Sequence, residues 1–174
     1  VVVGRKDLAK EMHAFARNTG PSMSPFNAWV LTKSLETLHV RMDRHASNAL
    51  LVSKRLERHP AVAKVRYPWL ESHPRFDVAR KQMSNGGGIV TFELAGGLEA
   101  GKRFLNHLGW LSRTNNLGDS RTIVSHPAST THAKLTEEER QAVGITPGLI
   151  RVSVGLEHPE DIAGQLETSL EASW

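Results

Sequence analysis

Apolar residues recur every three or four positions from Ala28 to Leu56, and no Gly or Pro interrupts the run before Pro60. Ser24-Pro25 just ahead of it is typical of a helix start, since Ser caps free N–H groups and Pro fits the first helical position. The spacing predicts one long helix of about 50 Å, at a rise of about 1.5 Å per residue. One small domain does not cover that length, so we expect the helix to cross between domains or to lie in a subunit interface. An isolated coiled coil is disfavoured because the flanking charges are irregular.

Short strands and helices are predicted to alternate after Pro60, which is typical of an α/β or α+β domain. Alternating or β-rich segments predict the strands, and periodic segments with capping signals predict the helices. The predicted strands are 62–67, 88–94, 121–125 and 149–154. The predicted helices are 6–18, 74–83, 98–108, 136–144 and one opening at Pro159.

Composition narrows the class of protein. Hydrophobic residues make up 39% and charged residues 23% of the 174, which is typical of a globular chain. The chain has no Cys, which excludes disulfides and thiolate metal sites and fits a reducing, cytoplasmic compartment. No apolar run reaches the roughly 18 residues of a membrane span, so no membrane partner is expected. The opening Val1-Val2-Val3-Gly4, without an initiator Met, suggests that the chain begins inside a larger protein.

Nucleic acid is a possible partner for a chain of net charge +4, but we expect none. The basic residues are scattered, and the aromatic residues number only four Trp, one Tyr and five Phe. A single-strand binding platform needs aromatic rings beside a basic groove. A solvated basic surface is therefore favoured.

Three motifs resemble ligand sites and are disfavoured. Gly96–Lys102 has phosphate-loop spacing, but Arg103 stands where Mg²⁺ binding needs Ser or Thr. A turn into a helix is the favoured interpretation. The Gly86–Gly88 run leads into a strand, so no helix N-terminus follows to hold an anion, and a flexible turn is favoured.

Histidines give no metal site by spacing. His126 and His132 are six residues apart, which is not a helical ligand spacing, and His59 and His73 lie elsewhere. No carboxylate is placed to complete a set of ligands. We therefore expect no metal.

Arg151 is unusual because it lies inside an apolar strand. Ile150 and Val152 share one face, and Arg151 points to the other with Leu149 and Ser153. Burying a guanidinium there is costly unless it meets a carboxylate or water. Its planar fork matches a carboxylate with two parallel hydrogen bonds. From spacing alone, an exposed Arg or an internal ion pair is the favoured explanation of the residue.

Segments along essentially the whole chain resemble the Cys/Met-metabolism family of pyridoxal-phosphate enzymes. The family includes cystathionine γ-synthase, cystathionine β- and γ-lyases, methionine γ-lyase and O-acyl-homoserine sulfhydrylases. The segments that carry the resemblance are Gly20–Ala28, Lys33–Met42, Thr114–Ser120, His126–His132, Gly144-Ile145 and Leu149–Glu157. Those over residues 20–42 are most similar to the O-succinylhomoserine sulfhydrylase branch.

The resemblance implies site residues and an activity. Arg151 would pair with the α-carboxylate of the amino-acid substrate, Asn116 would add a second contact to it, and Thr131 would lie near the same pocket. Thr131 is as readily explained as a structural Thr bonding the backbone. The lyases carry Ser at the position of Asn116, which argues against a plain γ-lyase. The implied reaction is γ-replacement, in which sulfide displaces the acyl group of O-succinylhomoserine to give homocysteine.

The resemblance also implies the fold and the cofactor. The expected fold is α/β, the α+β-like C-terminal domain of the type I aminotransferase-like fold. It would have a small, mostly antiparallel sheet with helices on one face, preceded by a long inter-domain helix. Residues 1–48 would be the tail of the cofactor-binding large domain, and 49–174 the small domain. Pyridoxal phosphate is expected in the parent enzyme, whose Schiff-base lysine and other cofactor contacts would lie upstream of Val1.

This chain alone is therefore expected to be inactive, with no catalytic residue of its own, and the parent to be a homo-oligomer, a dimer or tetramer. Cystathionine γ-synthase or methionine γ-lyase is the alternative within the family. A catalytically empty assembly domain, or a basic nucleic-acid binder, is the alternative from another class.

Overall fold

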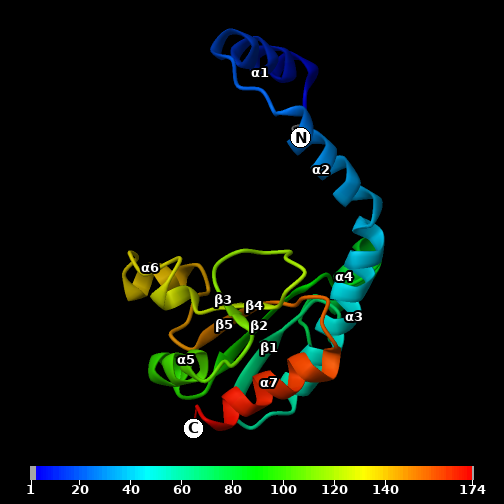
Figure 1. Ribbon diagram of the computed structural model, residues 1–174. Helices are drawn as coiled ribbons and strands as arrows, with labels where there is room; N and C mark the ends of the chain where they lie inside the picture. The colour runs from blue at the N-terminus through cyan, green and yellow to red at the C-terminus, as the bar shows by residue number, and fades with distance from the viewer. Residues whose placement is uncertain (1–2, 174) are drawn as a thin grey trace. The chain divides into compact units, whose positions relative to one another are not determined.

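The computed structural model describes residues 3–173 (Figure 1). The chain separates into two compact units, which divide between Leu38 and His39. Helices α1 (Lys6–Thr19) and α2 (Pro25–Glu36) belong to the first unit, and neither buries a residue. Helix α3 (Leu38–Glu57) begins at the division and buries one face in the second unit.

The predicted helix start at Ser24 is confirmed, and the prediction of one uninterrupted helix is wrong at Thr37. The Ser24 hydroxyl accepts the N–H of Asn27 at 3.2 Å, with Pro25 in the first turn. Thr37 has φ −105° and ψ 5°, so it leaves helical geometry and separates α2 from α3. A β-branched Thr is a weak helix former, which makes it a natural point for a break that the apolar spacing cannot reveal.

A five-stranded sheet forms the centre of the second unit, in the order β1-β2-β5-β4-β3. Its strands are β1 (Val62–Arg66), β2 (Ile89–Leu94), β3 (Ser112–Arg113), β4 (Ile123–Ser125) and β5 (Leu149–Ser153). Every pairing is antiparallel except that of β3 with β4. The predicted mostly antiparallel sheet is confirmed. β3 was not predicted, because two residues carry no alternation.

One face of the sheet is covered by α3, α5 (Gly97–Asn106) and α7 (Pro159–Glu171), whose apolar residues share its core (Figure 1). Phe92 of β2 packs edge-on against Phe104 of α5, with ring centroids 5.6 Å apart. Fully burying one such side chain stabilises the fold by about 1.5–3 kcal/mol. The helices on one face agree with the predicted fold class, and Arg151 lies on the opposite face.

Short elements fill the connections: α4 (Phe76–Gln82), the 3₁₀ turn η1 (Pro127–Ser129) and α6 (Glu137–Ala142). The predicted capping box of α6 is confirmed, since Thr136 and Glu139 each accept the other's backbone N–H. Among residues 3–173, no helix has both the length and the apolar character that crossing a membrane requires.

Candidate functional site

Arg151 occupies the middle of β5, the central strand of the sheet. Its Cα pairs with Thr91 of β2 on one side and with Ser125 of β4 on the other. Ile150 and Val152 are fully buried in the core, so Arg151 projects from the opposite face, as the alternation predicted. The Arg151 side chain is half-buried there.

Within the described part of the chain, the Arg151 guanidinium makes one hydrogen bond, from Nη2 to the backbone carbonyl of Asn115 at 2.9 Å. Throughout residues 3–173, no carboxylate lies within ion-pair distance of it, which excludes an internal ion pair in this part of the chain. The guanidinium therefore keeps donors for a carboxylate supplied from outside. The hydrogen bond to Asn115 also holds the guanidinium beside the loop that carries Asn116.

Ser125 adds an unsatisfied polar atom beside Arg151. Its residue is 4% exposed, and its Oγ has no hydrogen-bond partner within the described chain. Ser125 pairs directly with Arg151 across β4 and β5, so both side chains project from the same face. A buried hydroxyl without a partner costs about 1–3 kcal/mol. The sequence offered no signal for Ser125 except its place in a strand.

Asn116 and Thr131 both lie on the surface. Asn116 is exposed and follows Asn115, the residue that accepts from Arg151. Thr131 is exposed, and its hydroxyl is hydrogen-bonded to Nδ1 of the His132 ring at 2.8 Å. The chain thus brings the Asn116 loop to Arg151, while a role for Thr131 in substrate binding stays a prediction.

The loop that carries Asn116 is anchored to β5 and to its own end. Gly118 donates its N–H to Ser153 Oγ at 3.0 Å, and the Asp119 carboxylate accepts the N–H of Arg121 at 3.0 Å. That backbone bond lowers the pKa of Asp119 below its ordinary value, with smaller effects from Ser120 and the Arg121 charge. Asp119 therefore stays ionised and keeps the turn closed at neutral pH.

Sequence reasoning missed a polar cluster around the end of β5. Two buried side chains of α3, His45 and Asn48, reach the backbone after β5, and Thr122 reaches it from the other side. The apolar spacing from Ala28 to Leu56 predicted the helix and gave His45 and Asn48 no role. A His and an Asn three residues apart on the inner face of a predicted helix were the available signal.

The disfavoured motifs have structural roles. Lys102 pairs with Glu99 at 2.8 Å, so it is held within its own helix. The buried His126 ring uses both nitrogens, toward Ser129 Oγ at 2.8 Å and the carbonyl of Pro147 at 2.7 Å. Gly86 is packed tightly, because a Cβ there would be 2.5 Å from the Tyr67 hydroxyl, so the predicted flexible turn is more constrained than expected. Among the described residues, no group of His, Asp or Glu could hold a metal ion.

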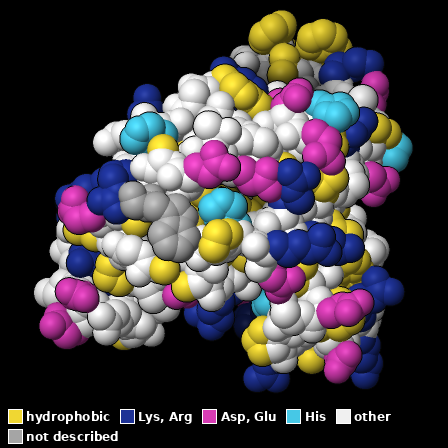
Figure 2. All heavy atoms as spheres, turned by 90° about the horizontal axis from the view of Figure 1, so that it is seen from below, with side chains coloured by type: hydrophobic (Ala, Val, Ile, Leu, Met, Phe, Trp, Pro, Cys, Tyr) yellow, Lys and Arg dark blue, Asp and Glu magenta, His cyan; other side chains and the backbone are white. Residues whose placement is uncertain are grey.

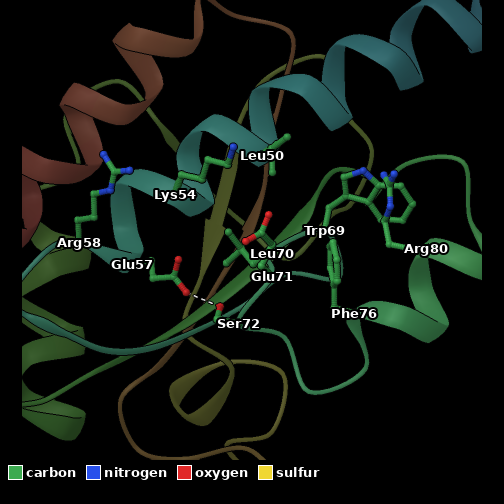
Figure 3. A pocket seen from close by; sticks show the side chains of 10 residues that line it. All are labelled: Leu50, Lys54, Glu57, Arg58, Trp69, Leu70, Glu71, Ser72, Phe76 and Arg80. Carbon is green, nitrogen blue, oxygen red and sulfur yellow. Dashed lines mark hydrogen bonds between the residues drawn. The ribbon is translucent and has the colours of Figure 1, made fainter.

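A cavity of about 660 Å³ lies between α3 and α4, away from Arg151 (Figure 3). Its lining mixes three cations with two carboxylates, and none of Arg151, Asn116 or Thr131 contributes to it. Arg80 lies over the ring of Trp69, and Glu57 is hydrogen-bonded to Ser72. On the face drawn in Figure 2, basic and acidic side chains are interspersed.

Comparison with known proteins places these features in a family. The profile described as "Cys/Met metabolism PLP-dependent enzyme" matches residues 1–171. An O-succinylhomoserine sulfhydrylase of Pseudomonas aeruginosa is 44% identical over 99% of this chain and 43% of its own length. An L-methionine gamma-lyase of Fusobacterium nucleatum is 46% identical over 98% of this chain and 44% of its own length. An O-acetyl-L-homoserine sulfhydrylase of Leptospira meyeri is 45% identical over 89% and 36%. The chain spans less than half the length of these relatives.

Proposed function

We propose, because this chain belongs to the Cys/Met metabolism family of pyridoxal-phosphate-dependent enzymes, that it is the C-terminal region of a γ-replacement enzyme. The parent enzyme would make homocysteine from O-succinylhomoserine and sulfide. In it, Arg151 binds the α-carboxylate of the amino-acid substrate. Asn116 contributes a second donor from the adjacent loop, and Thr131 lies at the edge of the same pocket.

The observation that carries the proposal is the arrangement around the guanidinium of Arg151. Within residues 3–173 the guanidinium has one backbone partner and no carboxylate. It is half-buried on the central strand and adjoins Ser125, whose hydroxyl has no partner among the same residues. A substrate carboxylate would accept from the guanidinium through two parallel bonds. The hydroxyl of Ser125 would gain a polar neighbour in the same event.

Arg151 and the groups around it suit the carboxylate of the substrate. They do not suit the aldehyde or the phosphate of the cofactor. Its neighbours Asn115, Thr91 and Ser125 carry no amine and form no helix N-terminus that would hold a phosphate. When bound in the parent, pyridoxal phosphate supplies an electron sink for the substrate's carbon skeleton. We place the lysine that holds it, and its phosphate contacts, upstream of Val1.

The part played by this chain is orientation. A carboxylate held by Arg151 and Asn116 fixes the substrate's Cα–H bond in one direction and converts a loose encounter into a defined geometry. The guanidinium offers hydrogen-bond donors and no acceptor, so it clamps the carboxylate without acting as a base. The proton transfers belong to groups upstream of Val1, and on this proposal the 174 residues alone are inactive.

O-Succinylhomoserine with sulfide is proposed over methionine γ-elimination because of Asn116 and the segments over residues 20–42. The family's lyases carry Ser where this chain has Asn116, whose amide offers two donors in place of one hydroxyl. The methionine γ-lyase of F. nucleatum, at 46% identity, makes elimination the second candidate. Nucleic-acid binding and a purely structural assembly role have no comparable support.

Turnover by the full-length parent tests the proposal. Purified protein should absorb visible light from bound pyridoxal phosphate and form homocysteine from O-succinylhomoserine and sulfide. Two rival reactions are measured beside it. In one, cysteine replaces sulfide as the nucleophile; in the other, methionine alone is the substrate for elimination. Faster α-ketobutyrate release from methionine would favour the lyase, and absence of both cofactor and turnover would refute the enzyme proposal.

The same preparation tests the remaining proposals. We place residues 1–48 with the large domain and 49–174 in the small domain, and we propose a cytoplasmic homo-oligomer, a dimer or tetramer. Light scattering measures the assembly. Limited proteolysis tests the domain division, because cleavage falls where few contacts cross. Cleavage close to residue 38, where the two compact units divide, with none around the buried Asn48, would move the boundary from residue 48 toward residue 38.

A further inference from the structure

Two buried side chains of α3, His45 and Asn48, hold the segment that follows β5. His45 donates from Nδ1 to the carbonyl of Val154 at 2.6 Å. Asn48 uses both hydrogens of its amide, toward the carbonyls of Gly155 at 3.0 Å and Glu157 at 2.9 Å. Exposure is 3% for His45 and 1% for Asn48, so losing either donor strands a buried carbonyl.

Thr122 holds the same segment from the opposite side. Its N–H and its hydroxyl both donate to the Glu157 carboxylate, at 2.6 and 2.8 Å, and the hydroxyl accepts from the N–H of Gly155 at 2.8 Å. A Cβ on Gly155 would lie 2.5 Å from the backbone nitrogen of Thr122, so a larger residue does not fit. The backbone after β5 is therefore held by α3 on one side and by Thr122 on the other.

The fixed segment continues directly into the strand that carries Arg151. Ser153, the last residue of β5, accepts the N–H of Gly118, and Arg151 donates to the carbonyl of Asn115. A shift of residues 154–157 would consequently move Arg151 and the loop with Asn116 together. These bonds all lie within the second unit of the chain.

We propose that His45 and Asn48 are positioning residues, which set the place of Arg151 and of the 115–118 loop against the substrate carboxylate. The inference rests on the proposed function of Arg151 and adds residues that touch neither substrate nor cofactor. A misplacement of about 1 Å in a catalytic site can cost on the order of 100-fold in rate. His45 and Asn48 together supply three donors to the segment after β5. Removing the donors of one of these residues should lower the rate by less than that, and should mainly weaken substrate binding.

Steady-state kinetics of the full-length parent test this positioning. His45→Phe keeps a ring and removes the donor, and Asn48→Ala removes both amide hydrogens. For each variant we expect KM for O-succinylhomoserine to rise about tenfold, with kcat within about threefold of the original enzyme. A fall in kcat with KM unchanged, or unchanged kinetics in both variants, would overturn the proposal.

Two further variants separate positioning from mere folding. His45→Asn places an amide nitrogen near the site of Nδ1, and we expect it to restore most of the KM lost in His45→Phe. Ser53→Ala is the matched control, since Ser53 is equally buried on α3 but donates only to Leu50 of its own helix, at 2.9 Å. Its kinetics should equal those of the unmodified enzyme. If Asn48→Ala does not fold, the comparison of His45→Phe with His45→Asn still tests the proposal.

Amide hydrogen exchange gives a readout that does not depend on turnover. Gly118 and Gly155 donate to Ser153 and Thr122, and both amides should exchange about tenfold faster in His45→Phe and Asn48→Ala than in Ser53→Ala. An inactive parent would refute the proposed function, and the exchange rates alone would then test the positioning role of His45 and Asn48. Equal exchange rates in all variants would overturn that positioning role.

Discussion

Arg151 on β5 lies directly opposite Ser125 on β4, and the Ser125 hydroxyl has no hydrogen-bond partner among the described residues. A guanidinium with free donors and an unsatisfied hydroxyl thus share one face of the central sheet. The other face of the sheet is filled by apolar side chains, so these two polar groups lie on the face away from the core.

Arg151→Lys in the full-length parent should raise KM for the amino-acid substrate strongly and lower kcat/KM by about 100-fold or more, because an ammonium cannot reproduce the fork. Arg66→Lys on the edge strand β1, whose partner Glu93 lies at 3.4 Å, is the control and should change neither constant. Kinetics of Arg151→Lys equal to those of the unmodified enzyme would remove Arg151 from the site.

Ser125→Ala should affect the stability of the protein and its binding of substrate in different ways. Because the hydroxyl is buried and unpaired, its removal should leave the free energy of unfolding unchanged or raise it by about 1 kcal/mol. Urea unfolding measures this, and KM for the substrate should rise in the same variant. A loss of more than about 1 kcal/mol would mean that the hydroxyl has a partner in the folded protein.

Tyr67 should make stability fall in alkaline solution. Its hydroxyl is buried and directed to the carbonyls of Ala46 and Gly87, and burial raises its pKa from 10.0 to about 12. The unfolded chain releases this proton near pH 10 and the folded chain only near pH 12. The contribution is therefore complete below pH 10 and is lost as the pH rises from 10 to 12.

Tyr67→Phe provides the comparison for that pH dependence. It removes the titrating group, so unfolding measured from pH 8 to 12 should decline less steeply than in the unmodified chain. Lysines that titrate in the same range affect both proteins alike and cancel in the difference. Parallel curves would show that Tyr67 ionises as readily in the folded state as in the unfolded one.

Gly148→Ala should destabilise the second unit by about 2 kcal/mol or more, since clashes in a packed interior force the backbone to move. A Cβ at this position, just before β5, would lie 2.5 Å from the backbone oxygen of Leu94. Gly164→Ala on α7 is the matched control. A Cβ there meets nothing within 4 Å, and Ala in a helix should stabilise by about 0.5–1 kcal/mol. Thermal unfolding of both variants checks the contrast.

Local rules in the sequence determined most elements of this protein. The Ser24-Pro25 start, the capping box at Thr136 and the alternation along residues 149–154 each depend on side chains within a few positions, and each is confirmed. The family segments likewise lie along the chain, which is why family and cofactor followed from residue order. Arg151 was singled out because one charged residue interrupted an apolar pattern.

Only the tertiary structure decided which groups meet. Ser125 stands beside Arg151, and His45 and Asn48 beside the end of β5, through contacts that cross more than 20 or 100 positions of sequence. The break at Thr37 was equally hidden, because the apolar period continues through it. Local propensity and spacing report what one segment prefers; strand register and helix docking decide which polar atom lies opposite which, and so which groups surround Arg151.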